Sequence, residues 1–337
     1  MKQSTPPLFP QLYPRNCPIC ASDSQQSILE LDAASFIHSN PAYRMEKITA
    51  LGLPIDRSYS IVKCVQCGMI YSLYHLDADS EAQIYNLVID PEISLSKVMT
   101  VNRRIQDIQR WLGLLSLVNR EKPGEINLNV MDYGCGWGTH LLVAEGPGVQ
   151  VVGYDVTEWK VEWARQQGLT ICTTYDGLKK FAPYDIAICT SVLEHVHSPR
   201  ETIQEISALL RPGAYTLITC IVTAVTQESD WAEMKRRISS DEILPKEINP
   251  WEHLNYFTVE TLTRLMRENG FVPVDPYAEA QRSKAPQSRT EFIQNVIKSW
   301  KSGHTGIRTM AAYVRSRGRH HLQMAPAIPI YWQYARD

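Results

Sequence analysis

Three glycines at alternate positions follow a short apolar run in the segment VMDYGCGWGTH, residues 130–140. Gly134, Gly136 and Gly138 leave the backbone bare between an expected strand and an expected helix, where a nucleotide-like ligand can rest against it. Asp132 stands two residues before the first glycine. The dinucleotide fingerprint is G-x-G-x-x-G, and here the third glycine comes one residue too early for it. The segment therefore indicates a nucleotide-like ligand other than the usual dinucleotide.

A second acid, Asp155, ends the apolar segment VVGYDV, 19 residues after Gly136. An acid at this place can accept hydrogen bonds from both ribose hydroxyls of an adenosine. The spacing thus favours an adenosine-containing ligand without selecting one cofactor. The alternative is an exposed acid at a strand end with no ligand.

Four cysteines lie in two pairs with CxxC spacing: Cys17, Cys20, Cys64 and Cys67. Four thiolates in two such pairs suit a closed tetrahedral zinc site with a structural role. The gap of 43 residues between the pairs is longer than in most zinc ribbons. Two alternatives stay open: four unrelated thiols, or His38 or His75 in place of one cysteine.

The segment NPWEHLNYFT, residues 249–258, carries the best candidates for proton transfer. Glu252 and His253 are adjacent, so that one can face a substrate while the other orients it, and Tyr256 follows shortly after. An imidazole accepts a proton near neutral pH without a large environmental shift. His195 could be a base or a packed histidine at a strand exit. In the alternative interpretation, His253 and Tyr256 only pack the loop onto the sheet.

Strand and helix patterns alternate from residue 127 onward, and this alternation must position these residues. It predicts an α/β fold with a doubly wound parallel sheet and right-handed crossovers. Ile203, Ile206, Leu209 and Leu210 form one apolar face of an expected helix over 199–210. A further helix is expected after residue 257, with Thr258 capping its start and Gly270 ending it. The final segment AIPIYWQYARD predicts a last strand.

The organisation along the chain divides into four parts. We expect an extended proline-rich arm over 1–14, a zinc-ribbon-like domain over 15–80 and a helical linker over 81–126. Within the linker, residues 94–118 carry apolar residues at helical spacing, and EKPGE stops this helix. The catalytic domain is expected over 127–337, with insertions at 223–250 and 281–325.

The acid and the G-x-G-x-G pattern of residues 132–138 resemble class I S-adenosylmethionine-dependent methyltransferases. The segment YDIAICTSVLEHVHSPRETIQEISALLRPGAYTLIT resembles the fourth strand, helix and fifth strand of that family, with Ala214 in place of a glycine. The resemblance covers residues 127–275. It implies a Rossmann-like sheet of seven strands, with S-adenosylmethionine as cofactor.

The resemblance also implies particular roles. Asp132 would approach the cofactor's ammonium group, and Thr190, Ser191 and Leu193 would line the floor beneath its sulfonium. Tyr175, Asp176 and Gly177 would approach the adenine edge. The complete set of expected cofactor residues is Asp132, Tyr133, Gly134, Gly136, Gly138, Asp155, Val156, Tyr175, Asp176, Gly177, Thr190, Ser191 and Leu193.

Sugar and natural-product methyltransferases of this fold carry a similar E-H-x-x-Y-F segment over the acceptor pocket, and some carry a CxxC zinc domain before the catalytic domain. This resemblance implies His253, Glu252 and Tyr256 as catalytic residues and a sugar, peptide or other small-molecule acceptor. Zinc-bearing sugar C-methyltransferases continue with a further α/β domain, for which this chain is too short. TSVL stands where amino methyltransferases of DNA bases carry N/D-P-P-Y/F. This difference argues against methylation of the exocyclic amines of DNA bases. We expect methylation at O or N of the acceptor, although attack by carbon fits the same fold.

Composition excludes some classes of protein. A net charge of −2 gives no overall footprint for nucleic acid or anionic membrane. The start of the chain has no apolar signal segment and no run is long enough to span a membrane, so we expect a cytoplasmic protein. Two alternatives stay open: an RNA methyltransferase or RNA-binding protein that uses the ribbon and the basic stretch 281–321, and a non-catalytic scaffold.

Overall fold

The structure is a computed structural model that describes residues 12–38, 40–121, 127–220, 228–240, 242, 244, 247–275 and 331–335. Most of the expected arm at 1–14 and the whole basic stretch at 281–321 lie outside these residues. The expected insertion at 281–325 also lies outside them, and the one at 223–250 is described in part.

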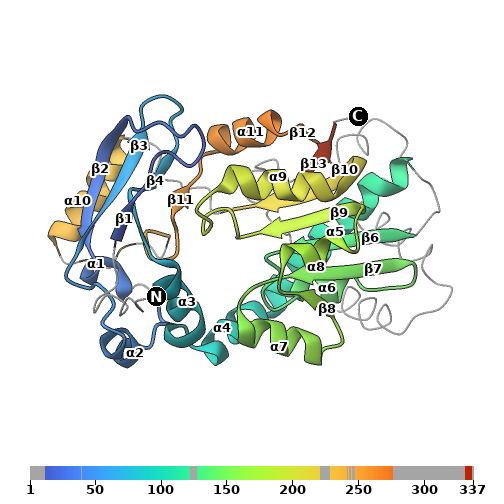
Figure 1. The fold of residues 1–337 in the computed structure, drawn as a ribbon, viewed down its shortest axis with the longest axis horizontal. Helices are drawn as coiled ribbons and strands as arrows, with labels where there is room; N and C mark the ends of the chain where they lie inside the picture. Colours follow the sequence, from blue (N-terminus) through green and yellow to red (C-terminus); the bar gives the residue numbers. More distant parts are fainter. Residues whose placement is uncertain are drawn as a thin grey trace, which may run out of the picture. The chain divides into compact units, whose positions relative to one another are not determined.

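Seven strands form the central sheet in the order β12-β13-β10-β9-β6-β7-β8 (Figure 1). Their bounds are β6 Leu128–Tyr133, β7 Val149–Tyr154, β8 Thr170–Cys172, β9 Tyr184–Thr190, β10 Leu210–Thr219, β12 Phe271–Pro273 and β13 Tyr331–Tyr334. The strands from β6 to β10 pair in parallel, whereas β13 runs antiparallel to β10 and β12. The chain order reverses between β6 and β9, the point where open α/β sheets bind ligands.

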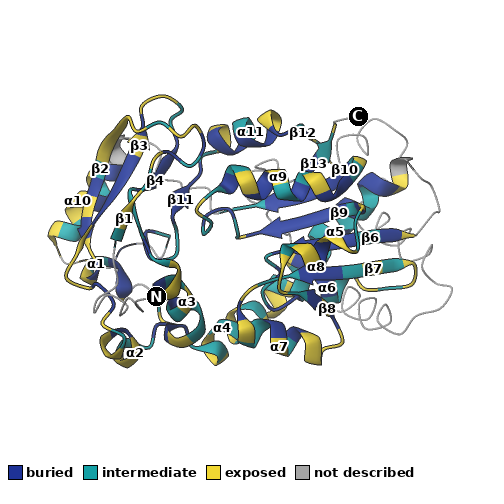
Figure 2. Ribbon diagram, viewed as in Figure 1, coloured by how far each residue is buried: buried dark blue, intermediate teal, exposed yellow. Residues whose placement is uncertain are grey.

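Helices cover both faces of this sheet. One apolar cluster joins the sheet to α8 (Tyr175–Lys179), α9 (Pro199–Leu209) and α11 (Val259–Glu268). A second cluster packs α6 (Thr139–Ala144) and α7 (Glu158–Gln166) against β8. Figure 2 shows the central strands β6 and β9 as almost wholly buried, as expected for parallel strands with helices on both sides. The predicted doubly wound α/β fold is confirmed, with β13 making the sheet mixed.

Local sequence signals account for the helix ends. Thr258 caps α11 as predicted, because its hydroxyl accepts the N–H of Thr261 at 3.1 Å, and Gly270 follows with φ +87°. The expected helix over 94–118 is instead two helices, α4 (Pro91–Val98) and α5 (Val101–Glu121). The hydroxyl of Thr100 accepts the N–H of Arg103 at 3.2 Å, which starts a new helix at this residue.

A second sheet has the strand order β11-β4-β3-β2. Its strands are β2 Gln25–Asp32, β3 Ser58–Cys64, β4 Ile70–Ser72 and β11 Asn255–Tyr256, and β1 (Leu12–Pro14) pairs separately with β5 (Tyr74–Leu76). The surrounding helical segments are α1 Ala34–Ile37, α2 Met45–Ala50, α3 Ala78–Gln83, the π-helical turn η1 Ile84–Val88 and α10 Glu228–Ser239. Trp231 and Met234 of α10 are buried in the apolar cluster of this sheet. No helix among the described residues is both long and apolar enough to cross a membrane.

Candidate cofactor, acceptor and metal sites

The glycine turn follows β6 directly, at the carboxyl edge of the central sheet. Gly134, Gly136 and Gly138 all have positive φ, at +72°, +52° and +70°. A Cβ at Gly134 would lie 2.3 Å from the Val192 side chain, so this position has no room for one. The nearest atom to a Cβ at Gly136 is Lys160 Cδ, at 3.9 Å. The turn therefore needs glycine for its conformation, and at Gly136 a Cβ would be in ordinary contact with the Lys160 side chain.

Asp132 is the last residue but one of β6, and its side chain is only 1% exposed. Neither carboxylate oxygen has a hydrogen-bond partner within the described part of the chain. Burial raises the pKa of Asp132 well above its usual range, and the charges of Asp107 and Asp155 add to this effect. A buried carboxyl group without partners costs several kcal/mol, so the arrangement suits a cationic ligand group that supplies the missing donors.

Asp155 follows β7 and is half-buried beside the glycine turn. One carboxylate oxygen accepts the N–H of Gly136 at 2.7 Å, and the other accepts the N–H of Thr157 at 2.8 Å. The carboxylate thus fixes the turn and the start of α7. Each oxygen keeps a second lone pair, which can accept a hydroxyl hydrogen.

The other expected cofactor residues differ in how far they are exposed at this edge of the sheet. Val156 is 67% exposed, and Asp176 is exposed near the start of α8. Ser191 is exposed at φ +56°, just after β9. By contrast, Leu193 is fully buried, and Tyr133 is buried with its hydroxyl donating to Glu205 of α9.

Three further expected cofactor residues take part in local packing. Thr190 is 9% exposed at the end of β9. The Tyr175 hydroxyl donates to the Glu205 carbonyl oxygen at 3.0 Å, and Gly177 lies in α8. The structure therefore brings together the turn, Asp132 and Asp155, while Leu193 and the Tyr133 ring face the core.

Asp107 of α5 is a buried acid near Asp132 that the sequence motifs did not predict. Asp107, 1% exposed, forms ion pairs with Arg103 at 3.3 Å and Arg110 at 3.6 Å. His140 of α6 places Nδ1 3.5 Å from Asp107 and Nε2 3.0 Å from the Thr190 hydroxyl. Burial, with the charges of Arg110 and Arg103, lowers the pKa of His140 to about 3, so the ring is neutral. The signal in the sequence is the spacing of Arg103, Asp107 and Arg110 along one helix face.

Two histidines meet in the loops that follow β9 and precede β11. The His195 and His253 rings lie 4.9 Å apart between centroids. His195 Nδ1 is 2.8 Å from the Glu252 carbonyl oxygen, and His253 Nδ1 is 2.8 Å from the Glu247 carbonyl oxygen. Since a carbonyl oxygen only accepts, both rings carry the proton on Nδ1, which leaves the Nε2 lone pair available in each.

Other groups define the electrostatics of this histidine pair. Burial lowers the pKa of His195 to about 4, and the neighbouring His253 acts in the same direction. The Tyr85 hydroxyl lies 3.1 Å from His195 Nδ1. The low pKa makes His195 a weak base, so the Nε2 atom of His253 is the better candidate to accept a proton from a substrate hydroxyl or amine.

The Glu252 side chain is held by protein groups rather than by solvent. Its Oε1 accepts hydrogen bonds from Asn40 at 2.8 Å, Tyr43 at 2.5 Å and Asn249 at 3.0 Å. Burial alone would raise the pKa of Glu252, but His253 and the Tyr43 hydrogen bond outweigh it and lower the pKa. The group is therefore a fixed anion beside the histidine pair.

Tyr256 lies in β11 with its side chain only 2% exposed, inside the apolar cluster of the second sheet. Burial raises its pKa, which makes its hydroxyl a poor proton acceptor at neutral pH. Sequence reasoning did not find Tyr85, Tyr43 or Asn40, because they lie far from residue 252 along the chain and share no motif with it.

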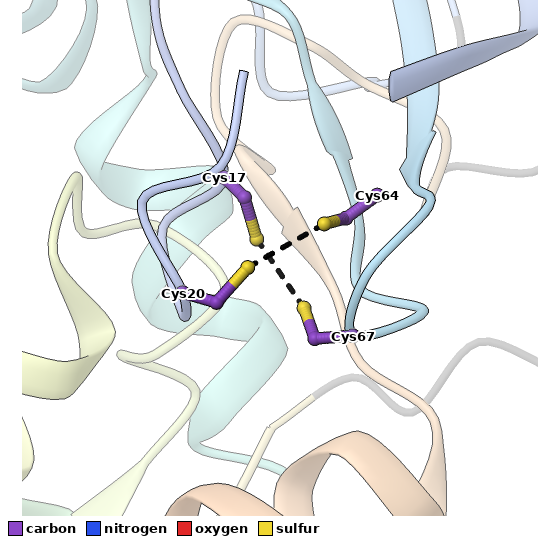
Figure 3. A group of neighbouring side chains, drawn as sticks. All are labelled: Cys17, Cys20, Cys64 and Cys67. Atoms are coloured by element: carbon purple, nitrogen blue, oxygen red, sulfur yellow. Dashed lines mark hydrogen bonds between the residues drawn. The ribbon is translucent and has the colours of Figure 1, made fainter. Parts of the chain in front are cut away.

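The four CxxC cysteines converge, with all four Sγ atoms within 4.8 Å of one another. Figure 3 shows them pointing toward a common centre, with Cys17 Sγ 3.4 Å from Cys67 Sγ and Cys20 Sγ 3.5 Å from Cys64 Sγ. These separations fit a tetrahedron of sulfurs about 2.3 Å from a central zinc ion. His38 and His75 are not members of this group.

The two CxxC turns have the same backbone design. The N–H of Ala21 donates to the Cys17 carbonyl oxygen at 2.9 Å, and the N–H of Gly68 donates to that of Cys64 at 3.0 Å. Ala21 and Gly68 have positive φ, at +59° and +75°. Each turn therefore directs its two thiols and its backbone amides to the same side, as in metal-binding knuckles.

The fold and the glycine turn define the class: this is a class I S-adenosylmethionine-dependent methyltransferase domain. A family model described as "Methyltransferase domain" matches residues 101–275, more than half of the 337-residue chain. The chain belongs to this family, as the sequence motifs predicted.

Relatives of known name agree with this class. A ubiquinone biosynthesis O-methyltransferase of Roseobacter denitrificans is 28% identical over 186 residues, which cover 52% of this chain and 67% of the relative. A protein of the same name from Leptothrix cholodnii is 27% identical over 39% of this chain and 57% of its own length. Among solved structures, the plantazolicin methyltransferase BamL in complex with a triazolic desmethylPZN analog and SAH is 14% identical with a TM-score of 0.43, covering 76% of this chain and 95% of that protein. The matched part of the chain thus corresponds to about two thirds of the length of the first of these two curated relatives and to little more than half of the second.

Proposed function

We propose that the protein transfers a methyl group from S-adenosylmethionine to O or N of a small-molecule, sugar, natural-product or peptide acceptor. The observation that carries this proposal is the buried Asp132 carboxyl group, which has no hydrogen-bond donor among the described residues and lies two residues before the glycine turn. The amino-acid end of the cofactor carries an ammonium group, which can donate the hydrogen bonds that the Asp132 carboxyl group lacks. When bound, the cofactor supplies an electrophilic methyl group on its sulfonium.

The residues at the sheet edge divide the work of holding the cofactor. Asp132 binds the ammonium group, and Asp155 accepts the ribose hydroxyls with its remaining lone pairs. Val156 offers an exposed apolar surface to the adenine, whose edge is approached by residues 175–177. Thr190 at the end of β9 and Ser191 just after it would lie beneath the sulfonium.

The acceptor is held beside the histidine pair. His253 accepts the acceptor's proton at Nε2 as methyl transfer proceeds, which requires a neutral imidazole with Nδ1 protonated. Glu252 stabilises the imidazolium that forms, and its own hydrogen bonds to Asn40 and Tyr43 hold it in place. The names of the curated relatives, both O-methyltransferases, support oxygen as the attacked atom.

Zinc bound by Cys17, Cys20, Cys64 and Cys67 completes the proposal. All four ligands are protein thiolates, so the site is closed and structural. Arg264 of α11 donates to the Cys67 carbonyl oxygen at 2.9 Å, and Arg200 of α9 donates to that of Ile19 at 2.8 Å. The metal would therefore stabilise the contact of both knuckles with two helices of the methyltransferase domain.

Isothermal titration of the full chain with S-adenosylmethionine tests whether Asp132 binds the cofactor. We expect saturable binding at one site, with Asp132→Asn reducing the affinity at least about tenfold because a charged partner is lost. Glu145→Gln, which neutralises an exposed acid just after α6, serves as the control. Equal affinity of Asp132→Asn and the wild-type protein would refute the assignment of Asp132.

A further inference from the structure

Outside the cysteine group, three potential metal ligands converge from separate elements. His75 belongs to β5, Glu81 to α3, and His197 to the loop between β9 and α9. One ligand atom of each residue lies within 4.8 Å of the other two. His197 is 116 residues from Glu81 in the chain, so the fold alone brings them together.

The donor atoms are arranged as a ligand set. His197 Nε2 lies 2.7 Å and 2.9 Å from the two Glu81 carboxylate oxygens. His75 Nδ1 lies 4.0 Å from Glu81 Oε1 and 2.7 Å from the Leu76 carbonyl oxygen. The carbonyl oxygen keeps the proton on Nδ1, so the lone pair of this ring is on Nε2. The two rings are 4.2 Å apart between centroids. The side chains of His75, Glu81 and His197 are 19%, 22% and 43% exposed, so an ion can reach them from solvent.

We infer that His75, Glu81 and His197 bind one divalent transition-metal ion of the Zn²⁺ type, with water in the remaining positions. Two imidazole nitrogens and one carboxylate suit zinc and its neighbours, whereas magnesium and calcium prefer oxygen ligands throughout. The Arg15 guanidinium lies near this group, and its hydrogen bonds go to Ser72, His197, Leu254 and Asn255. These bonds direct it at backbone and amide oxygens, whereas both oxygens of the Glu81 carboxylate face His197.

Two of the ligands are already held in place by their own segments. Asp77 caps α3 by accepting the N–H of Ser80 at 2.9 Å, which fixes the helix that carries Glu81. Arg15 donates to the His197 carbonyl oxygen at 3.1 Å, which fixes the loop. A site with ligands held in this way loses little conformational entropy when the ion binds.

The ion would connect two segments that lie next to the histidine pair of His195 and His253. Glu81 is followed within four residues by Tyr85, and His197 is preceded within two residues by His195. Tyr85 and His195 are themselves in contact at 3.1 Å. The metal would therefore hold Tyr85 and His195 at a fixed distance from each other. This consequence, unlike the metal binding itself, rests on the proposed function.

Zinc titration of the tag-free full chain tests the inference. The protein is first dialysed against a weak chelator that leaves the four-cysteine site loaded, and Zn²⁺ uptake is then followed by calorimetry without any methyl donor. We expect one further equivalent to bind. His197→Ala and Glu81→Gln should each weaken this binding at least about tenfold, since each removes one of three protein ligands. His38→Ala, which removes an exposed histidine outside the group, should bind as the wild-type protein does.

Cobalt provides a second measurement that identifies the ligands. The further equivalent of Co²⁺ should produce visible ligand-field bands without thiolate-to-cobalt charge transfer, because no sulfur belongs to this group. Circular dichroism of each variant checks that it is folded. Absence of a further equivalent in the wild-type protein, or unchanged affinity in folded His197→Ala, would overturn the inference. Either result leaves the titration with S-adenosylmethionine, and so the proposed function, unaffected.

Discussion

Replacement of Glu252 by glutamine removes a charge from the centre of the hydrogen-bond network that joins residues 40–43 to the histidine loop. The glutamine carbonyl oxygen can still accept the three hydrogen bonds from Asn40, Tyr43 and Asn249. A hydrogen bond to a charged acceptor contributes about 1 kcal/mol more than one to a neutral acceptor. Three such bonds predict a loss of about 2–3 kcal/mol in the free energy of unfolding. For a chain of 337 residues, this loss corresponds to a fall of about 3–4 °C in Tm.

The pH dependence of stability provides an independent check. The pKa of Glu252 is lower in the folded state than in the unfolded state, so protonation of this group favours unfolding. Its contribution to stability is present above the unfolded pKa of about 4.3 and is lost as the pH falls through the lower folded pKa. Glu252→Gln should therefore lose less stability than the wild-type protein when the pH is reduced below about 4.5.

Thermal and denaturant unfolding measure both effects, with Glu260→Gln as the control. Glu260 is 84% exposed at the start of α11, and its neutralisation should change stability by less than about 0.5 kcal/mol. A double-mutant cycle with Tyr43→Phe should give a coupling energy of about 1 kcal/mol, because the two groups share one hydrogen bond. Wild-type stability of Glu252→Gln, or strict additivity with Tyr43→Phe, would refute this account of the network.

Three further predictions address the other sites. Asp155→Ala should weaken S-adenosylmethionine binding at least about tenfold in calorimetry, because the variant loses the ribose acceptor and its bonds to the turn; unchanged affinity would contradict the ribose assignment. His253→Ala should lower the methyl-transfer rate about 100-fold while cofactor affinity stays constant, and full turnover would show that the ring only packs the loop. Cys64→Ser should reduce the zinc content in elemental analysis and lower Tm. Zinc-free wild-type protein prepared without chelators would contradict the four-cysteine site.

The sequence could predict the central sheet and its glycine turn because their signals are local. Alternation of apolar runs with helical periodicity predicted the strands from β6 to β10, and Thr258 marked the start of α11 correctly. The split of the linker helix at Thr100 was not predicted, since a single hydroxyl that caps a helix does not interrupt the apolar spacing. The short strands β11 and β12 were also missed, because two or three residues are too few to show a period.

The sequence by itself determined the class of the protein, because the acid, the three glycines and Asp155 lie at fixed short spacings on consecutive elements. Only the tertiary structure decided which side chains meet from distant segments. Tyr43 and Glu252 are 209 residues apart, and Tyr85 and His195 are 110 residues apart, yet each pair is in hydrogen-bond contact. The same applies to Tyr256, whose burial follows from the pairing of β11 with β4. Contacts of this kind depend on how the chain packs, and no periodicity within a single element records them.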